Sequence, residues 1–132
     1  MKKDIQNRQD IDALMRHFYV KLLDDETMSP IFVKVVEKGL DHHFATLVDF
    51  WDNILFFTGA YKKNAMAKHL EINAWYTLEK KHFEGWLSHF NDSVDELHAG
   101  EKAEMAKNRA KQIAILMEMK CAQMTEGIRN KY

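Results

Sequence analysis

Apolar residues along this chain recur every three or four positions, which is the period of α-helices. The first such run covers residues 11–22 and follows Asp10, a candidate N-cap. The acidic run 24–26 and then Pro30 are expected to end this helix, because the residue before a proline is pushed out of the α conformation. The apolar residues just after Pro30, Phe32 among them, are expected to turn inward.

A second helix is predicted from Asp41 onward, and it carries two neighbouring apolar stripes. One stripe is His43, Leu47, Phe50 and Ile54, and the other is Phe44, Val48, Trp51 and Leu55. Two adjacent stripes make a broad apolar face, so we expect this helix to be deeply buried.

The region after this helix is predicted to be irregular apart from one short helical piece. Residues 58–63 read as a loop. Asn64 is a candidate N-cap for the short helix, which then carries Met66 and His69 on one face.

Two further helices are predicted in the second half of the chain. One covers residues 83–94 and has Trp86 inside its apolar stripe. Gly100 breaks the pattern, and small apolar residues at helical spacing over 103–117 predict a last helix that allows close approach of a partner helix. The tail at 123–132 is expected to fray.

Composition supports a single helical domain. A chain of 132 residues can bury one core, and 46% hydrophobic with 30% charged residues is typical of a globular protein. Five glycines and one proline are too few turn signals for an all-β chain. We therefore expect one all-α domain over 1–132, with its core at about 10–120.

Charge and cysteine content exclude several classes of protein. The formal net charge is −1 with both signs scattered, so neither nucleic acid nor an anionic membrane is an expected partner. No apolar run follows the basic start, and none reaches the roughly 20 residues of a membrane span. We expect a cytoplasmic protein. A lone Cys121 excludes an internal disulfide and the Cys-x-x-Cys-His attachment of a c-type haem.

Four polar residues lie at positions that could face a common core. They are Tyr19, His43, His69 and Trp86. Together they offer one strong iron ligand, His69, and up to three hydrogen-bond donors, which is the inventory of a haem pocket. Taken singly, each has an ordinary explanation: His69 as a surface histidine, His43 as a histidine bonded to a carbonyl, and the other two as packing residues.

Apolar residues near these four would line a flat cavity, although such a stripe is also typical of an ordinary core. They are Phe18, Phe32, Leu47, Phe50 and Met66. Basic residues are candidates for pairing with haem propionates at the solvent edge. They include Lys62, Lys63 and Lys68.

A di-iron carboxylate site is the competing metal centre, and it requires Glu-x-x-His on two helices. Only the segment from Glu79 to His82 matches, and Asp95 to His98 is a weaker variant. Zinc motifs, phosphate-binding loops and nucleophile elbows are absent from the sequence.

Several short sequence pieces resemble the truncated haemoglobins, most closely their third group, in order and approximate spacing. The pieces are Phe18-Tyr19 with Pro30-Ile31-Phe32, then His43 with Asp49-Phe50-Trp51, Lys68-His69-Leu70, and Phe83-Glu84-Gly85-Trp86-Leu87. The likeness covers residues of about 10 to 120. The Gly-Gly motifs of the first group are missing, so that group's apolar ligand tunnel is not expected.

The resemblance implies a shortened globin in which two pairs of helices sandwich a non-covalent b-type haem. His69 matches the proximal iron ligand, and Tyr19, His43 and Trp86 match the ligand-side polar residues. Phe32 matches the Phe pressed against the haem plane. Phe18 and Leu47 match further apolar positions of the pocket.

The expected function is binding of dioxygen, nitric oxide or carbon monoxide at ferrous iron. A donor such as Tyr19 slows ligand release, which favours ligand chemistry or redox sensing over bulk oxygen transport. Nitric oxide dioxygenation or peroxide turnover would need an external reductase, since no NAD or flavin motif is present. The alternative is a haem-free, all-α interaction or regulatory module.

Overall fold

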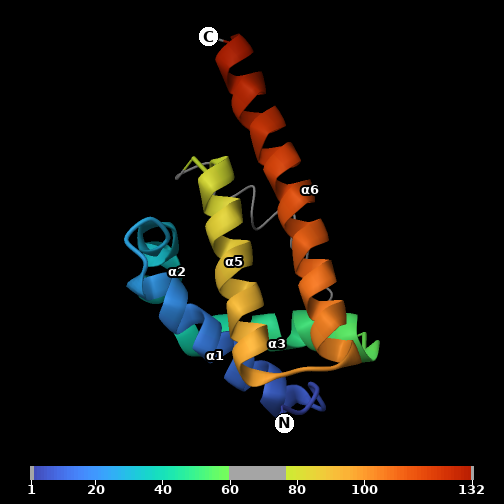
Figure 1. Cartoon of the computed structure of the whole chain (residues 1–132). Coiled ribbons are helices and arrows are strands. Elements are labelled where there is room, and N and C mark those ends of the chain that lie inside the picture. Colours follow the sequence, from blue (N-terminus) through green and yellow to red (C-terminus); the bar gives the residue numbers. More distant parts are fainter. Residues whose placement is uncertain (1, 60–76, 132) are drawn as a thin grey trace.

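Helices make up most of the chain in a computed structural model, which describes residues 2–59 and 77–131, with side chains up to residue 123. The elements in chain order are α1 (Arg8–Asp24), η1 (Ser29–Phe32), α2 (Val33–Lys38), α3 (Leu40–Phe56), α5 (Lys80–Leu97) and α6 (Glu101–Lys131) (Figure 1). None of the helices described is both long and apolar enough to cross a membrane.

The long helices form two pairs that cross each other. Helices α5 and α6 lie side by side, and α3 runs across them (Figure 1). Helix α1 packs on α3 and also on α5, while α3 touches α6. Each pair therefore covers one face of the other, and the core lies between them.

The ends of α1 differ in part from the prediction. The N-cap is Asn7, whose side chain accepts a hydrogen bond from the backbone N–H of Asp10, so the prediction of Asp10 as N-cap is wrong. Asn7 caps the helix because its side-chain oxygen accepts a hydrogen bond from a free N–H group of the first turn, and Asp10 already lies within that turn. The predicted end is confirmed, because α1 stops at Asp24.

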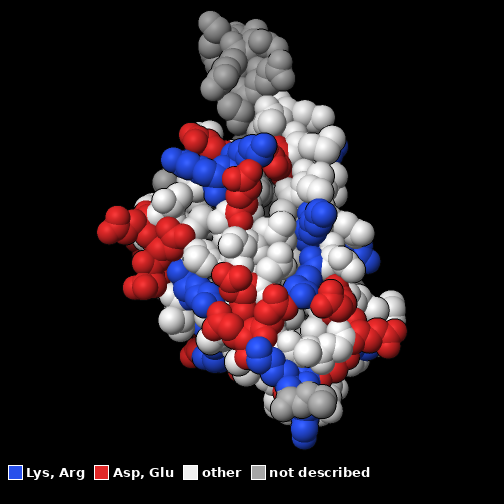
Figure 2. Space-filling view, in the orientation of Figure 1, with Lys and Arg blue, Asp and Glu red and all other residues white. Residues whose placement is uncertain are grey.

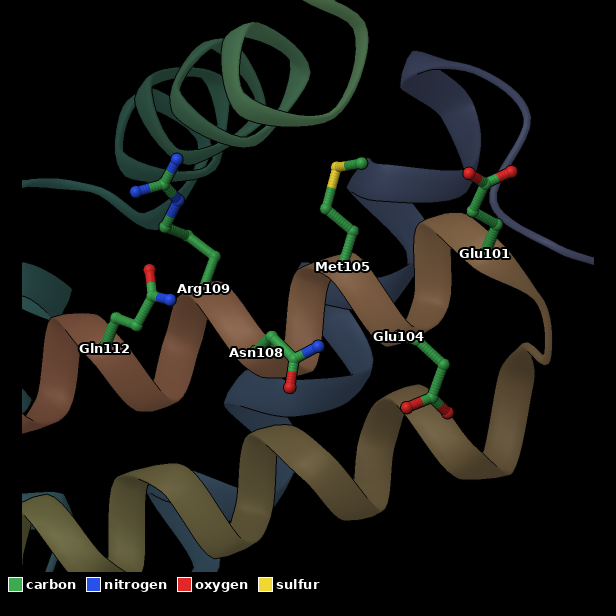
Figure 3. A pocket seen from close by; sticks show the side chains of 6 residues that line it. All are labelled: Glu101, Glu104, Met105, Asn108, Arg109 and Gln112. Carbon is green, nitrogen blue, oxygen red and sulfur yellow. The ribbon is translucent and has the colours of Figure 1, made fainter.

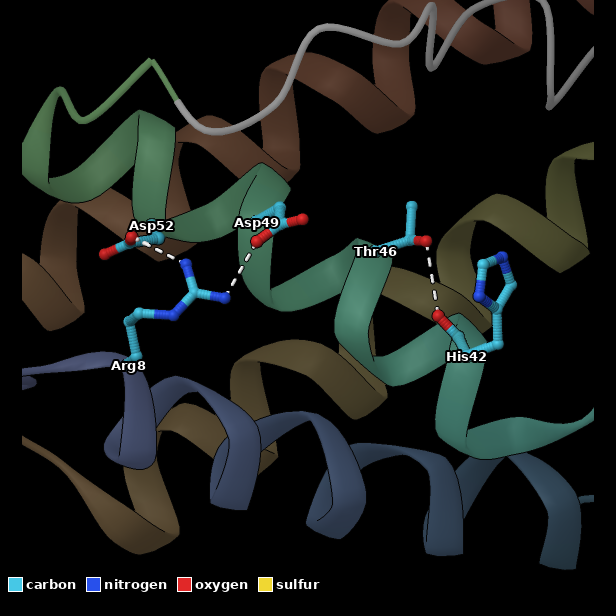
Figure 4. Close-up of polar contacts among 5 residues, drawn as sticks. All are labelled: Arg8, His42, Thr46, Asp49 and Asp52. Atoms are coloured by element: carbon cyan, nitrogen blue, oxygen red, sulfur yellow. Dashed lines mark hydrogen bonds and ion pairs between the residues drawn. The ribbon is translucent and has the colours of Figure 1, made fainter.

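An arginine on α1 fixes that helix against α3. The two terminal nitrogens of Arg8 lie 2.9 Å from Oδ2 of Asp52 and 2.8 Å from Oδ1 of Asp49 (Figure 4). Asp52 is buried, so the guanidinium compensates a charge that would otherwise be costly in the core. On the face shown in Figure 2, charges of both signs are interspersed.

The two apolar stripes of α3 are buried to different degrees. Phe44, Val48, Trp51 and Leu55 are at most 5% exposed. His43, Leu47, Phe50 and Ile54 are only half-buried, although three of the four are strongly apolar. The expectation of deep burial is confirmed for the first set and is wrong for the second, because the packed helices cover one side of α3 more fully than the other.

Helix α6 begins where a distant residue caps it. The carboxylate of Asp4 accepts hydrogen bonds from the backbone N–H groups of Lys102 and Ala103, at 2.8 Å each. Burial opposes the charged form, but these bonds and one from Ile5 outweigh it, so the pKa of Asp4 is lowered. The helix then continues to Lys131, past the predicted start of the frayed tail.

Replacing Asp4 by Ala is expected to destabilise the fold by about 1 to 2 kcal/mol, because two N–H groups at the start of α6 lose their acceptor. Urea unfolding of the full chain measures this loss. Asp12→Ala is the matched control, since Asp12 makes only a surface pair with Arg16 and its removal should cost less than about 0.5 kcal/mol. Equal losses for the two variants would contradict the capping role.

Candidate functional site

A tyrosine and a histidine meet between α1 and α3. The Tyr19 hydroxyl lies 2.6 Å from Nε2 of His43, and the two rings are 5.2 Å apart between centroids. Tyr19 is 4% exposed, and its burial raises the pKa of the phenol well above its ordinary value. The hydroxyl therefore keeps its proton and remains a hydrogen-bond donor. The structure thus brings together two of the residues predicted for the ligand side.

Three further aromatic rings pack against Tyr19. Phe18, Phe32 and Phe44 lie edge-on to it, at centroid distances of 5.6, 5.4 and 5.3 Å. Rings set edge to face in this way attract one another and exclude water. Phe18 and Phe32 were predicted site residues, and both are buried next to the tyrosine.

Trp86 lies one ring further along the same aromatic cluster. Its ring is 5.9 Å from Phe18, edge-on, and 5.7 Å from Phe90, stacked. Phe18 therefore separates Trp86 from Tyr19. Trp86 is half-buried, as are Leu47 and Phe50 on α3.

Some of the predicted site residues lie outside the described part of the chain. His69, the candidate iron ligand, and Met66 lie outside the described residues, as do the lysines considered for the propionates. Their roles stay predictions.

Sequence reasoning missed several members of the cluster. Phe90 is fully buried, with Trp51 stacked on one side of it at 4.9 Å and Trp86 on another. Phe44 packs on Tyr19 from the same helix turn as His43. The apolar stripes predict Phe44, Trp51 and Phe90 as core residues. Only the three-dimensional arrangement shows that they adjoin the site.

A shallow hollow of about 390 Å³ lies on the surface of α6. Its lining comes from α6 alone (Figure 3) and consists of Glu101, Glu104, Met105, Asn108, Arg109 and Gln112. None of the predicted site residues takes part, so this hollow is a separate surface feature.

The segment from Glu79 to His82 serves a structural purpose. Nδ1 of His82 accepts the backbone N–H of Glu79 at 2.8 Å, which caps the start of α5. Among the described residues no group of three or more histidine, cysteine or acidic side chains could hold a metal. The di-iron alternative therefore gains no support from this part of the chain.

Acidification is expected to weaken the fold through His82. Burial, and then repulsion from Lys81, lower the pKa of His82. A histidine whose folded pKa lies below its unfolded value of about 6.5 binds its proton more readily when unfolded, so stability falls as the pH drops below about 6.5. In His82→Gln the amide oxygen can still accept the Glu79 N–H, but it does not titrate.

Urea unfolding of wild type and His82→Gln at pH 7.5 and 5.5 measures this effect. The wild type should lose more stability on acidification than the variant does. Other histidines are common to both proteins and cancel in the difference. A variant that loses as much as the wild type would show that His82 is not the group responsible.

Known proteins show the same architecture. No family model matches this sequence. The group 3 truncated hemoglobin ctb of Campylobacter jejuni is 29% identical over 117 residues, covering 86% of this chain and 90% of that protein. The crystal structure of group III truncated hemoglobin from Campylobacter jejuni superposes with a TM-score of 0.80 at 27% identity, covering 92% of this chain and 95% of the other.

Two crossed helix pairs, together with these similarities, define an all-α globin fold of the truncated type. The resemblance to the truncated haemoglobins that the motifs predict, most closely to their third group, is confirmed.

Proposed function

We propose that this chain is a haem globin that binds dioxygen, nitric oxide and similar small ligands at ferrous iron held by His69. The observation that carries the proposal is the Tyr19–His43 hydrogen bond at 2.6 Å inside an aromatic shell. Haem b, held without a covalent bond, supplies the ferrous iron at which a diatomic ligand binds. Tyr19, His43 and Trp86 form the ligand side.

The residues present fit such a group in two respects, namely a partly uncovered apolar surface on α3 and a polar histidine beside that surface. The half-buried stripe of α3 offers apolar side chains, Leu47 and Phe50 among them, that the packed helices leave partly uncovered. A flat, apolar macrocycle would complete their burial, at roughly 25 cal/mol for each Å² removed from water. His43 lies at one end of this stripe, so its polar ring adjoins the apolar wall.

The role of Tyr19 is to donate a hydrogen bond to the bound ligand. Because burial raises its pKa, the hydroxyl carries its proton at any physiological pH. If His43 bears its proton on Nε2, it donates to the Tyr19 oxygen and leaves the O–H free for the ligand. His43 would then orient the tyrosine as well as border the ligand.

Such a donor in a dry pocket slows ligand release, which suits ligand chemistry or redox sensing better than bulk oxygen transport. A charge-assisted hydrogen bond contributes about 1.5 to 3 kcal/mol. Nitric oxide dioxygenation or peroxide turnover would require electrons from an external reductase. Sustained consumption of nitric oxide with a reductase supplied would support nitric oxide dioxygenation. A single turnover would argue for redox sensing instead.

Haemin titration of the full chain tests the proposal that His69 is the iron ligand. Wild type and the control variant His42→Ala, which removes the exposed histidine next to His43, should take up one haem per chain. His69→Gly should bind haem weakly with an altered spectrum, and added imidazole should restore it. A His69→Gly variant that matches wild type would remove His69 from this role.

A further inference from the structure

The corner between α1 and η1 is built on one residue, Asp25. Its backbone carbonyl accepts hydrogen bonds from the N–H groups of Met28 and Ser29, at 3.1 and 2.8 Å. One of its carboxylate oxygens accepts the N–H of Thr27 at 2.8 Å. The shape of this corner therefore depends on where Asp25 is held.

The same residue ties the corner to α5. The second carboxylate oxygen of Asp25 lies 2.8 Å from Nε2 of His89, and this contact lowers the pKa of Asp25. Both side chains are less than a third exposed, so water screens the pair only partly. Beside it, Met28 is buried against α5 so closely that a Cβ added to Gly85 would lie 3.1 Å from its sulfur.

The corner leads into η1, and the end of η1 lies next to the proposed ligand site. Phe32, at the end of η1, packs edge-on against Tyr19 at 5.4 Å. On the α5 side, Trp86 directly follows Gly85 in the sequence. The His89–Asp25 bond and the Met28–Gly85 contact thus join the element that holds Phe32 to the helix that holds Trp86.

We propose that His89 is a positioning residue for the ligand side. Through Asp25 it clamps the corner to α5 and so sets where Phe32, and with it Tyr19, lies relative to Trp86. His89 itself does not touch the ligand. This inference rests on the proposed haem function, although the clamp itself can be tested without haem.

Amide hydrogen exchange in the purified full chain tests the clamp. In His89→Ala the amides of Thr27, Met28 and Ser29 should exchange about tenfold faster than in wild type, because the corner loses its anchor. His89→Gln should restore protection, since its amide nitrogen can donate to Asp25 as Nε2 does. His17→Ala is the matched control, because it removes another histidine–carboxylate pair between α1 and α5, His17 with Glu96 at 3.1 Å.

The C–O stretching band of the haem-loaded carbon monoxide complex tests the positioning. The band should shift or broaden in His89→Ala, return to its wild-type position in His89→Gln and stay unchanged in His17→Ala.

Exchange rates in His89→Ala that equal those of His17→Ala would overturn the clamp. An unchanged band would overturn the positioning role even where exchange rises. Wild type that takes up no haem would defeat the proposed function instead, and the exchange data would still report on the clamp.

Discussion

Replacement of Tyr19 by Phe is expected to speed oxygen dissociation from the ferrous protein by about ten- to a hundredfold. The variant keeps the ring that Phe18, Phe32 and Phe44 enclose and removes only the hydroxyl. The lost hydrogen bond is worth about 1.5 to 3 kcal/mol, and each 1.4 kcal/mol is a factor of ten. Stopped-flow displacement of oxygen by carbon monoxide measures the rate.

Two comparisons make this result specific. Carbon monoxide carries little negative charge when bound, so its own dissociation should change much less than that of oxygen. His42→Ala should leave both rates unchanged, because this histidine is exposed and lies beside the pair without belonging to it. An oxygen dissociation rate that Tyr19→Phe leaves at the wild-type value would show that Tyr19 is not the donor.

Replacement of Phe90 by Ala is expected to destabilise the fold by about 3 to 5 kcal/mol, the range for large aromatic residues in cores. Phe90 is fully buried and joins both sides of the aromatic cluster. Its ring stacks with Trp51 at 4.9 Å and Trp86 at 5.7 Å and meets Phe18 edge-on at 5.3 Å. Helices α1, α3 and α5 would all lose a shared contact.

Phe57→Ala is the control for this loss, because Phe57 is 79% exposed. Its removal should change stability by less than about 0.5 kcal/mol. Urea unfolding should be measured on the same haem state of all proteins, since a bound ligand raises apparent stability. Similar losses in the two variants would contradict the central position assigned to Phe90.

Helical periodicity was sufficient to predict the long helices of the described chain. The apolar repeat over 11–22 lies within α1, and the two stripes after Asp41 lie on α3. Local patterns did not resolve the short elements η1 and α2, because four to six residues are too few to show a period. The cap on α1 was misplaced for a related reason, since both Asn7 and Asp10 are good capping residues.

For the candidate site, the sequence proposes which residues take part but does not predict how they are arranged. Tyr19 and His43 are 24 positions apart, and only the antiparallel packing of α1 on α3 brings them into hydrogen-bond distance. The contact between His89 and Asp25 spans 64 positions and has no motif. The burial difference between neighbouring stripes of α3 likewise depends on what packs over each stripe, which no local pattern records.

The visible absorption spectrum of the purified protein, loaded with haemin, reduced and then exposed to carbon monoxide, tests the central claim most directly. We predict a sharp Soret band at one haem per chain that shifts on addition of carbon monoxide. A well-folded helical chain that takes up no stoichiometric haem and shows no such shift would contradict the account and favour a haem-free interaction or regulatory module.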